Sequence, residues 1–159
     1  MIRVGLGQDQ HQLVAGRPLV LGGVELARQR GLRGHSDADV LTHAVIDALL
    51  GAAALGTIGE HFPDTDERYR GASSLTLLAT TAEMLAERGW RVGNVDSVIV
   101  AQAPRLQPHL RTMASRLAEV LRVDADRVSV KATSPERTGA LGREEAIAAS
   151  AVALLEARA

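Results

Sequence analysis

Gly34-His35-Ser36-Asp37-Ala38-Asp39-Val40-Leu41-Thr42-His43 is the stretch around which the rest of the chain is organised. An apolar helical run follows it, which predicts a helix from about residue 37 to residue 54. Ser36 followed three residues later by Asp39 has the form of a capping box. We therefore expect His35 just before a helix start, where backbone N–H groups and the helix dipole attract anions.

His43 lies one turn inside this predicted helix. Asp39 and Asp47 are each four residues away, so both carboxylates share a helix face with the imidazole. Either carboxylate could orient the outer nitrogen of His43, and the spacing does not choose between them. Such a group at a helix entrance suits a metal or a phosphate, and a capped helix with a polar stripe is the structural alternative.

A second polar pair lies in the first predicted strand, residues 2–13. Asp9 and His11 are two residues apart, so on a strand they point to the same face. Together with His43 they supply one carboxylate and two imidazoles, a suitable set for a catalytic zinc, which takes three protein ligands and keeps one position open. The chain has no cysteine, so any transition metal must be held by histidine and carboxylate. Two polar residues on the solvent face of a strand are the alternative.

The remaining pattern predicts strands that alternate with helices, and hence a sheet with helices packed on it. The expected elements are a hairpin over 17–26 bent at Gly22-Gly23, a loop over 55–66, a helix from Ser73 or Ser74 to about 88, a strand over 95–101, a helix from Pro108 to about 121 and a strand over 128–133. The segment from 146 to 155 fits either a helix or a sheet-closing strand. The hydroxyl-rich loop over 133–139 follows a strand, a typical binding position.

Length and charge limit the classes of function. The 159 residues suit one domain with a real core, so we expect residues 1–159 to form a single domain. A net charge of −1 and an aromatic content of 2% argue against a nucleic-acid partner. No stretch approaches the run of about 20 apolar residues that spans a bilayer, so we expect no membrane segment. The N-terminus enters strand-like sequence directly, without the pattern of a signal peptide, which predicts a cytoplasmic location.

Further motifs occur in a fixed order along nearly the whole chain. They are Gly-x-Asp-x-His at 7–11, His-Ser-Asp-x-Asp-x-x-x-His at 35–43, Asp-Ala-Leu-Leu-Gly-Ala at 47–52, Phe-Pro-Asp-Thr-Asp at 62–66, Gly-Asn-Val-Asp at 93–96, Ala-Gln-Ala-Pro at 101–104 and Lys-Ala-Thr at 131–133. With this set the chain resembles the 2-C-methyl-D-erythritol 2,4-cyclodiphosphate synthase family of the non-mevalonate isoprenoid pathway. The resemblance implies an α+β fold in two layers, a mixed β-sheet with helices on one face. It also implies a homotrimer with active sites between neighbouring subunits.

The resemblance implies a reaction as well. The family converts 4-diphosphocytidyl-2-C-methyl-D-erythritol 2-phosphate to the 2,4-cyclodiphosphate with release of CMP. By resemblance, Asp9, His11 and His43 bind zinc, and Glu136 holds a second divalent ion, Mg²⁺ or Mn²⁺, between the phosphates. Two alternatives remain open from the sequence. One is a zinc-dependent nucleotide phosphohydrolase that uses water as nucleophile, and the other is a non-catalytic trimeric binding scaffold.

The same resemblance assigns roles to individual positions. His35 and Ser134 are the expected catalytic residues. The expected substrate-binding residues are Asp9, Gln10, His11, His35, Ser36, Thr57, Ile58, Gly59, His61, Phe62, Pro63, Asp64, Thr65, Asp66, Ala101, Gln102, Ala103, Pro104, Arg105, Leu106, Thr133, Ser134, Pro135, Glu136 and Arg143. For Asp64 and Asp66 the alternative is that they only form turns.

Several positions depart from the family pattern. Thr57 stands where relatives commonly carry an aspartate that binds substrate hydroxyls. Ser134 replaces a threonine but keeps the hydroxyl. Gln8 and Ala140 stand where phenylalanines line a central cavity of the trimer, so an isoprenoid diphosphate ligand of that cavity is not expected here.

Overall fold

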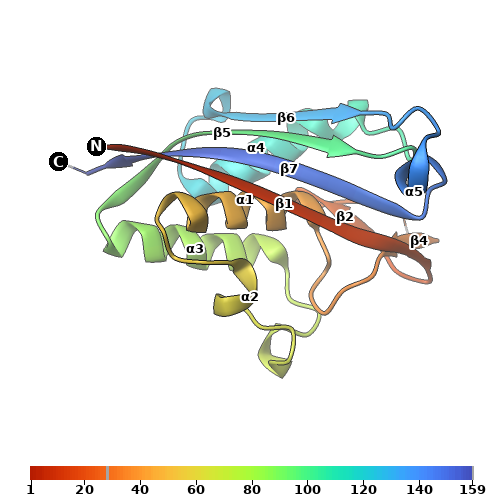
Figure 1. The fold of residues 1–159 in the computed structure, drawn as a ribbon, viewed down its shortest axis with the longest axis horizontal. Coiled ribbons are helices and arrows are strands. Elements are labelled where there is room, and N and C mark those ends of the chain that lie inside the picture. The colour runs from red at the N-terminus through yellow and green to blue at the C-terminus, as the bar shows by residue number, and fades with distance from the viewer. Residues whose placement is uncertain (28, 159) are drawn as a thin grey trace.

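Five strands form one mixed sheet in the computed structural model, which describes residues 1–27 and 29–158 (Figure 1). Their order across the sheet is β4-β1-β7-β5-β6. In chain order their bounds are β1 Ile2–Ala15, β4 Arg30–Leu32, β5 Trp90–Val100, β6 Val128–Thr133 and β7 Ala146–Ala157. The β5–β6 pair is parallel and the others are antiparallel. A separate hairpin is formed by β2, Leu19–Leu21, and β3, Val24–Ala27.

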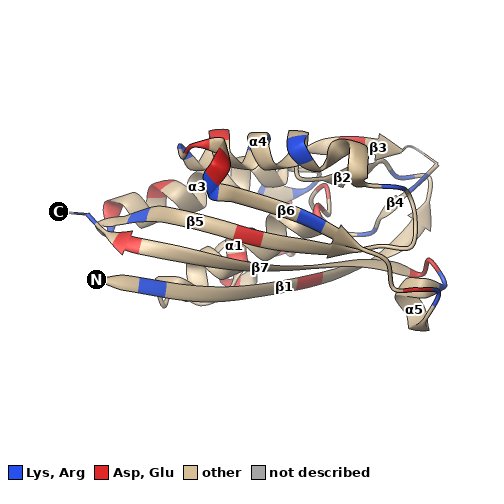
Figure 2. Ribbon diagram, turned by 90° about the horizontal axis from the view of Figure 1, so that it is seen from above, with Lys and Arg blue, Asp and Glu red and all other residues tan. Residues whose placement is uncertain are grey.

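Three helices cover one face of the sheet (Figures 1 and 2). They are α1 Val40–Ala52, α3 Ser74–Glu87 and α4 Leu110–Leu121. The shorter elements are α2 Ile58–His61, α5 Gly139–Gly142 and the 3₁₀ turns η1 Glu67–Tyr69, η2 Gln107–His109 and η3 Ala125–Arg127. The predicted α+β fold with a mixed sheet is therefore confirmed. No helix in the described ranges is long and apolar enough to cross a membrane.

The central helix α1 lies unusually close to the sheet at two glycines of β1. A Cβ atom built on Gly7 would lie 2.0 Å from the carbonyl oxygen of Ala44, and one built on Gly5 would lie 2.0 Å from that of Ala48. Both glycines face the helix because strand residues alternate between faces, and the facing helix residues are alanines. The pairing of glycine with alanine brings the two backbones together and buries α1 almost completely.

The C-terminal segment, which the sequence left open between helix and strand, is strand β7 in the middle of the sheet. It pairs with β1 on one side and with β5 on the other. Buried and less buried residues alternate along β7, because alternate side chains of a strand point to opposite faces and one set faces the helices. Alanines favour helix in isolation, and here the hydrogen bonds of two neighbouring strands override that preference.

Other boundaries differ from the sequence prediction. β5 begins at Trp90, five residues earlier than expected, and the predicted loop over 55–66 contains the short helix α2. The helix predicted from about residue 37 begins at Val40. Its N-cap is Asp39, which accepts a hydrogen bond from the Thr42 backbone, so the capping box expected at Ser36 is wrong. The fully buried Asp39 also accepts from the backbones of Gly22 and Gly23, and it thereby ties the hairpin to α1.

We expect Gly7→Ala to destabilise the fold, because the added methyl group would press on the Ala44 carbonyl and force α1 away from β1. The expected loss is about 1–3 kcal/mol in the free energy of unfolding, measured by urea denaturation. Gly51→Ala is the matched control, since the nearest atom to its added carbon is 4.0 Å away. That helical substitution should raise stability by about 0.5–1 kcal/mol. Equal stability of Gly7→Ala and the wild type would contradict the proposed close contact.

Candidate active site

Two elements bring the three predicted metal ligands together. Asp9 and His11 project from β1, and His43 projects from the first turn of α1. Asp9 Oδ2 lies 2.9 Å from His11 Nε2 and 3.0 Å from His43 Nδ1. One ligand atom from each residue lies within 4.8 Å of the other two, and within the described ranges this is the one such group of three or more His, Cys, Asp or Glu residues. The arrangement could hold a divalent metal ion.

Hydrogen bonds on the outer nitrogens leave the inner nitrogens of both histidines free for a metal. His11 Nδ1 lies 2.7 Å from the Arg33 carbonyl oxygen, which can only accept, so this nitrogen carries the proton and Nε2 carries the lone pair. His43 Nε2 lies 2.8 Å from Ser74 Oγ. The Ser74 hydroxyl donates its one proton to Asp37, so it must accept from His43, and Nδ1 is left with the lone pair.

The residues that orient His43 are therefore not those that its helix spacing suggested. Asp39 accepts hydrogen bonds from backbone groups and from the Thr42 hydroxyl. Asp47 accepts from the backbone of Ile58 at 2.8 Å and so positions α2. The expectation that Asp39 or Asp47 holds the imidazole is wrong, because a contact four residues along a helix competes with partners from other elements. Sequence reasoning missed Ser74, since it lies 31 residues from His43 on α3.

The charge of the Asp9 carboxylate suits the binding of a cation at this site. Burial raises the pKa of Asp9, but the two imidazoles, when a proton occupies the nitrogen that faces Asp9, outweigh burial through hydrogen bonds and charge and hold that pKa well below its usual range. Burial lowers the pKa of His11, and the hydrogen bond and charge of Asp9 more than offset it, so the net shift is upward. A carboxylate that stays ionised between two imidazoles presents a negative centre to a metal ion.

A cavity of about 370 Å³ opens beside the three ligands. Many of the predicted substrate-binding residues line it, namely Asp9, His11, His35, Ser36, Ile58, Gly59, Phe62, Pro63 and Asp64. Gly34, the first residue of the stretch 34–43, lines it as well. Tyr69 and Leu77 also line it, and the motifs did not indicate them. Tyr69 stands edge-on to Phe62, with ring centroids 5.5 Å apart. Such cross-element contacts leave no periodic signal in the sequence.

Thr57, His61, Asp66 and Gln10 were predicted to bind substrate but do not line this cavity. Thr57 caps α2, and its hydroxyl lies 3.2 Å from Glu60 Oε1. His61 Nε2 lies 2.7 Å from the Leu55 carbonyl oxygen, and the Asp66 carboxylate accepts from the Arg68 side chain. The His35 imidazole is held in the cavity wall by the Asp66 carbonyl, 2.8 Å from Nε2. Gln10 is exposed on the opposite face of β1, as the alternation of strand side chains requires.

The predicted nucleotide-binding residues gather elsewhere, at the carboxyl ends of the parallel strands β5 and β6. The Ala101 backbone donates to the Thr133 carbonyl at 3.2 Å, and the Arg137 backbone donates to Gln102 Oε1 at 2.8 Å. Glu136 and Arg137 both have φ values in the left-handed region, 54° and 58°. Strained backbone of this kind is typical of binding loops. None of residues 101–106 or 133–136 lines the 370 Å³ cavity.

Comparison with known proteins identifies the family. A family model described as the YgbB family matches residues 2–156. A 2-C-methyl-D-erythritol 2,4-cyclodiphosphate synthase of Desulfitobacterium hafniense (strain DSM 10664 / DCB-2) is 56% identical over 98% of this chain and 98% of its own length. The corresponding enzyme of Thermosynechococcus vestitus is 58% identical over 98% of this chain and 96% of its own. The chain therefore belongs to the YgbB family of 2-C-methyl-D-erythritol 2,4-cyclodiphosphate synthases, lyases of isoprenoid precursor synthesis.

Solved structures agree with this assignment. The bifunctional IspDF from Campylobacter jejuni matches with a TM-score of 0.95 at 41% identity, over 99% of this chain and 42% of that longer chain. IspF of Plasmodium falciparum in a CDP complex matches with a TM-score of 0.86 at 29% identity, over 99% and 97% of the two chains. A 2C-methyl-D-erythritol-2,4-cyclodiphosphate synthase in a CDP-bound form matches with a TM-score of 0.88 at 36% identity, over 97% and 100%.

We expect Ser74→Ala to weaken metal binding by about 10–100-fold, because the orienting partner of His43 Nε2 is lost. Competition with a chromogenic chelator measures this affinity without reference to turnover. Ser73→Ala is the matched control, since the Ser73 side chain makes no capping hydrogen bond on the same helix. Metal affinity unchanged in Ser74→Ala would show that the Asp37–Ser74–His43 connection does not position the ligand.

Proposed function

We propose that the chain converts 4-diphosphocytidyl-2-C-methyl-D-erythritol 2-phosphate to 2-C-methyl-D-erythritol 2,4-cyclodiphosphate and CMP, with zinc held by Asp9, His11 and His43. The observation that carries the proposal is this carboxylate and imidazole triad in the wall of a cavity, in a chain that belongs to the synthase family. Two CDP-bound structural relatives support a cytidyl nucleotide as part of the substrate. We take residues 1–159 as one domain that acts in the cytoplasm.

The reaction is an internal phosphoryl transfer. An oxygen of the 2-phosphate attacks the β-phosphorus and forms the new P–O–P bond of the ring. The bond from the β-phosphorus to the bridging oxygen breaks, and CMP leaves with the electron pair. The nucleophile is already ionised, so the site needs no strong general base. Holding both reacting ends in one pocket makes the step effectively unimolecular and lowers its entropic cost.

The chain's residues would each contribute to this geometry. A zinc ion, when bound, supplies positive charge that offsets the repulsion between two anionic phosphates. His35 and Ser36 lie in the cavity wall where phosphate or sugar would contact them, and Ile58 to Asp64 would enclose the sugar. The Ser134 hydroxyl accepts a hydrogen bond from the Glu136 backbone at 3.0 Å, which fixes the turn that would meet the diphosphate.

Glu136 would hold the second divalent ion, Mg²⁺ or Mn²⁺. Among the described residues it has no group of His, Cys, Asp or Glu partners around it. An ion at this carboxylate would therefore take most of its ligands from the substrate phosphates and water, which is the usual behaviour of Mg²⁺. The second ion would thus bind together with the diphosphate.

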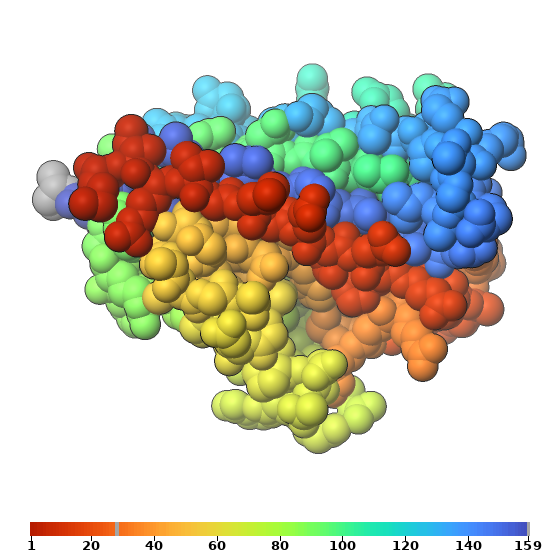
Figure 3. Space-filling model, viewed as in Figure 1, coloured from red at the N-terminus to blue at the C-terminus, as the bar shows by residue number. Residues whose placement is uncertain are grey.

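We also propose a homotrimer in which the nucleotide loop of one subunit completes the metal cavity of its neighbour. Two observations support it. The nucleotide residues 101–106 and the metal cavity occupy different regions of one chain. The sheet face opposite the helices exposes the large apolar residues Ile2, Val4, Leu6 and Val152, whose exposed fractions are 65%, 63%, 64% and 44%. In Figure 3, β1 runs in red across this open face. Contiguous exposed apolar surface of this kind marks an interface.

Product identification tests the proposed reaction. We expect phosphorus NMR to show that the cytidyl substrate gives equal amounts of CMP and the cyclic diphosphate. We expect elemental analysis to find one zinc per chain. His43→Ala should lose both the zinc and the products. An open-chain phosphate would identify a hydrolase, and nucleotide binding without CMP release would identify a binding scaffold. Either result would overturn the proposal.

The trimer has its own test. Leu6→Glu puts a carboxylate in the middle of the exposed apolar strand face, so its burial between subunits would be costly. We expect light scattering to give the mass of a trimer for the wild type and a smaller species for this variant, with activity lost in parallel. Thr112→Glu, exposed on α4 in the helical layer, is the charge-matched control and should stay trimeric. A fully active wild-type monomer would contradict the shared site.

A further inference from the structure

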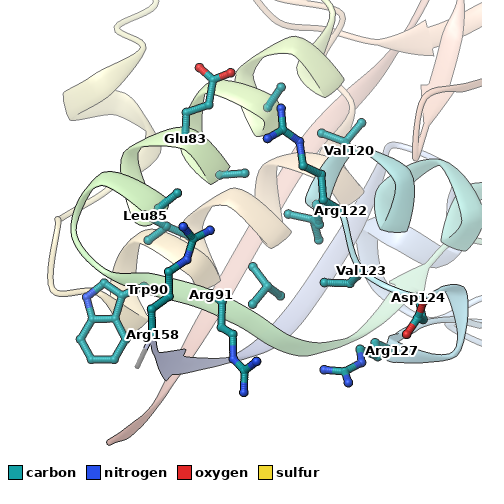
Figure 4. A pocket seen from close by; sticks show the side chains of 15 residues that line it. Glu83, Leu85, Trp90, Arg91, Val120, Arg122, Val123, Asp124, Arg127 and Arg158 are labelled. Atoms are coloured by element: carbon teal, nitrogen blue, oxygen red, sulfur yellow. The ribbon is translucent and has the colours of Figure 1, made fainter.

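A second cavity, of about 300 Å³, lies between the C-terminal ends of α3 and α4, the start of β5 and the end of β7 (Figure 4). None of the residues discussed for the synthase reaction lines it. Four arginines, Arg91, Arg122, Arg127 and Arg158, line it together with two acidic residues, Glu83 and Asp124. We call this cavity the arginine pocket. Its charge balance favours an anion.

Two of the four guanidinium groups are already engaged. Arg91 Nη2 lies 2.6 Å from Glu156 Oε2, and Arg127 Nη1 lies 3.3 Å from the Gly93 carbonyl oxygen. The side chains of Arg122 and Arg158 form no hydrogen bond or ion pair with any residue that the structure describes. Arg122 directly follows the last residue of α4, and Arg158 directly follows the last residue of β7. Their donors are therefore available to a ligand.

The backbone at Arg122 points to a functional reason for its side chain. This residue ends α4 in the left-handed conformation, with φ of 57° and ψ of 44°. Glycine is the residue that this helix-terminating position favours, because a side chain there is strained. Figure 4 shows the Arg122 side chain reaching from the end of α4 toward α3. A strained position that keeps a long cationic side chain is a candidate for ligand binding.

The rest of the pocket is apolar. Leu85, Val92, Val120 and Leu121 contribute to its walls, and Trp90 stands at its edge. The Arg3 guanidinium lies 4.7 Å from the centre of the Trp90 ring, which adds another cation at this end of the molecule. Cationic groups beside apolar walls suit a ligand with an anionic head and a small apolar part.

We propose that the arginine pocket binds a small phosphate monoester, with its phosphate held by Arg122 and Arg158 and its organic part against the apolar wall. Guanidinium groups bind phosphate oxygens through paired, charge-assisted hydrogen bonds. The volume of about 300 Å³ matches a small-molecule site. A nucleic acid is a poor fit, because the chain has a net charge of −1 and few aromatic residues for stacking. This site is separate from the proposed reaction and does not depend on it.

Trp90 is the one tryptophan of the sequence and it lines this pocket, so tryptophan fluorescence can detect binding there. The experiment titrates zinc-loaded protein with inorganic phosphate and with butyl phosphate and follows tryptophan fluorescence. We expect a saturable change for both, with tighter binding of butyl phosphate because of the apolar wall. Sodium chloride at matched ionic strength should leave the emission unchanged. Phosphate bound at the metal cavity would not change the tryptophan fluorescence, since no tryptophan lines that cavity.

Three single variants locate the binding. Arg122→Gln and Arg158→Gln should each weaken butyl phosphate binding by about tenfold, the loss expected for one charge-assisted contact. Arg111→Gln removes the same charge from an exposed position of α4 outside the pocket, and it should bind like the wild type. Circular dichroism checks that all three variants fold.

Several outcomes would overturn the proposal. They are an unchanged tryptophan signal up to millimolar phosphate ester, wild-type affinity in both pocket variants, and equal losses in Arg111→Gln and Arg122→Gln. The last result would mean that only overall charge attracts the anion. Butyl phosphate that binds no more tightly than inorganic phosphate would refute the apolar part of the site. Because the readout does not involve CMP release, these failures are distinguishable from failure of the synthase assay.

Discussion

The close approach of α1 to β1 is the contact on which the metal site depends. Gly5 and Gly7 have no Cβ, so the carbonyls of Ala44 and Ala48 can rest against the strand. This distance sets the position of His43, which follows Thr42 in the first turn of the same helix, relative to Asp9 at the next inward-facing position of β1. The 3.0 Å contact between His43 and Asp9 is thus a consequence of glycine and alanine packing one turn away.

Some polar groups around the site connect secondary-structure elements to one another, and others orient the metal-binding side chains. Asp39 fixes the helix start to the hairpin, and Asp47 fixes the helix to α2. Asp37 accepts a hydrogen bond from the Ser74 backbone, which anchors the N-terminus of α3. It also accepts from the Ser74 hydroxyl, which in turn accepts from His43 Nε2. Three carboxylates within one short stretch therefore serve three different purposes. Their partners come from elements far away in sequence, so spacing along the helix could not separate their roles.

The predictable part of the site is the part carried by local pattern. Asp9 and His11 share a strand face because strand side chains alternate, and that inference needs no partner. The motifs also indicated the residues of the cavity wall between Ile58 and Asp64. Tyr69, Leu77 and Ser74 were not predicted, because each reaches the site through a contact between elements. The arginine pocket was not predicted for the same reason, since its arginines come from the end of α4, from β5, from the 3₁₀ turn η3 and from the position after β7.

The sequence by itself determined the alternation of strands and helices, the metal-ligand types, the glycine turn of the hairpin and the family. These features depend on residue chemistry and on periodicities of 2.0 and 3.6 residues. Only the tertiary structure decided that residues 146–157 form the central strand, because the flanking strands β1 and β5 supply its hydrogen bonds. It also decided which nitrogen of each histidine is free, because the partner of the other nitrogen lies on a different segment. Long-range hydrogen bonds, which no local pattern encodes, account for both.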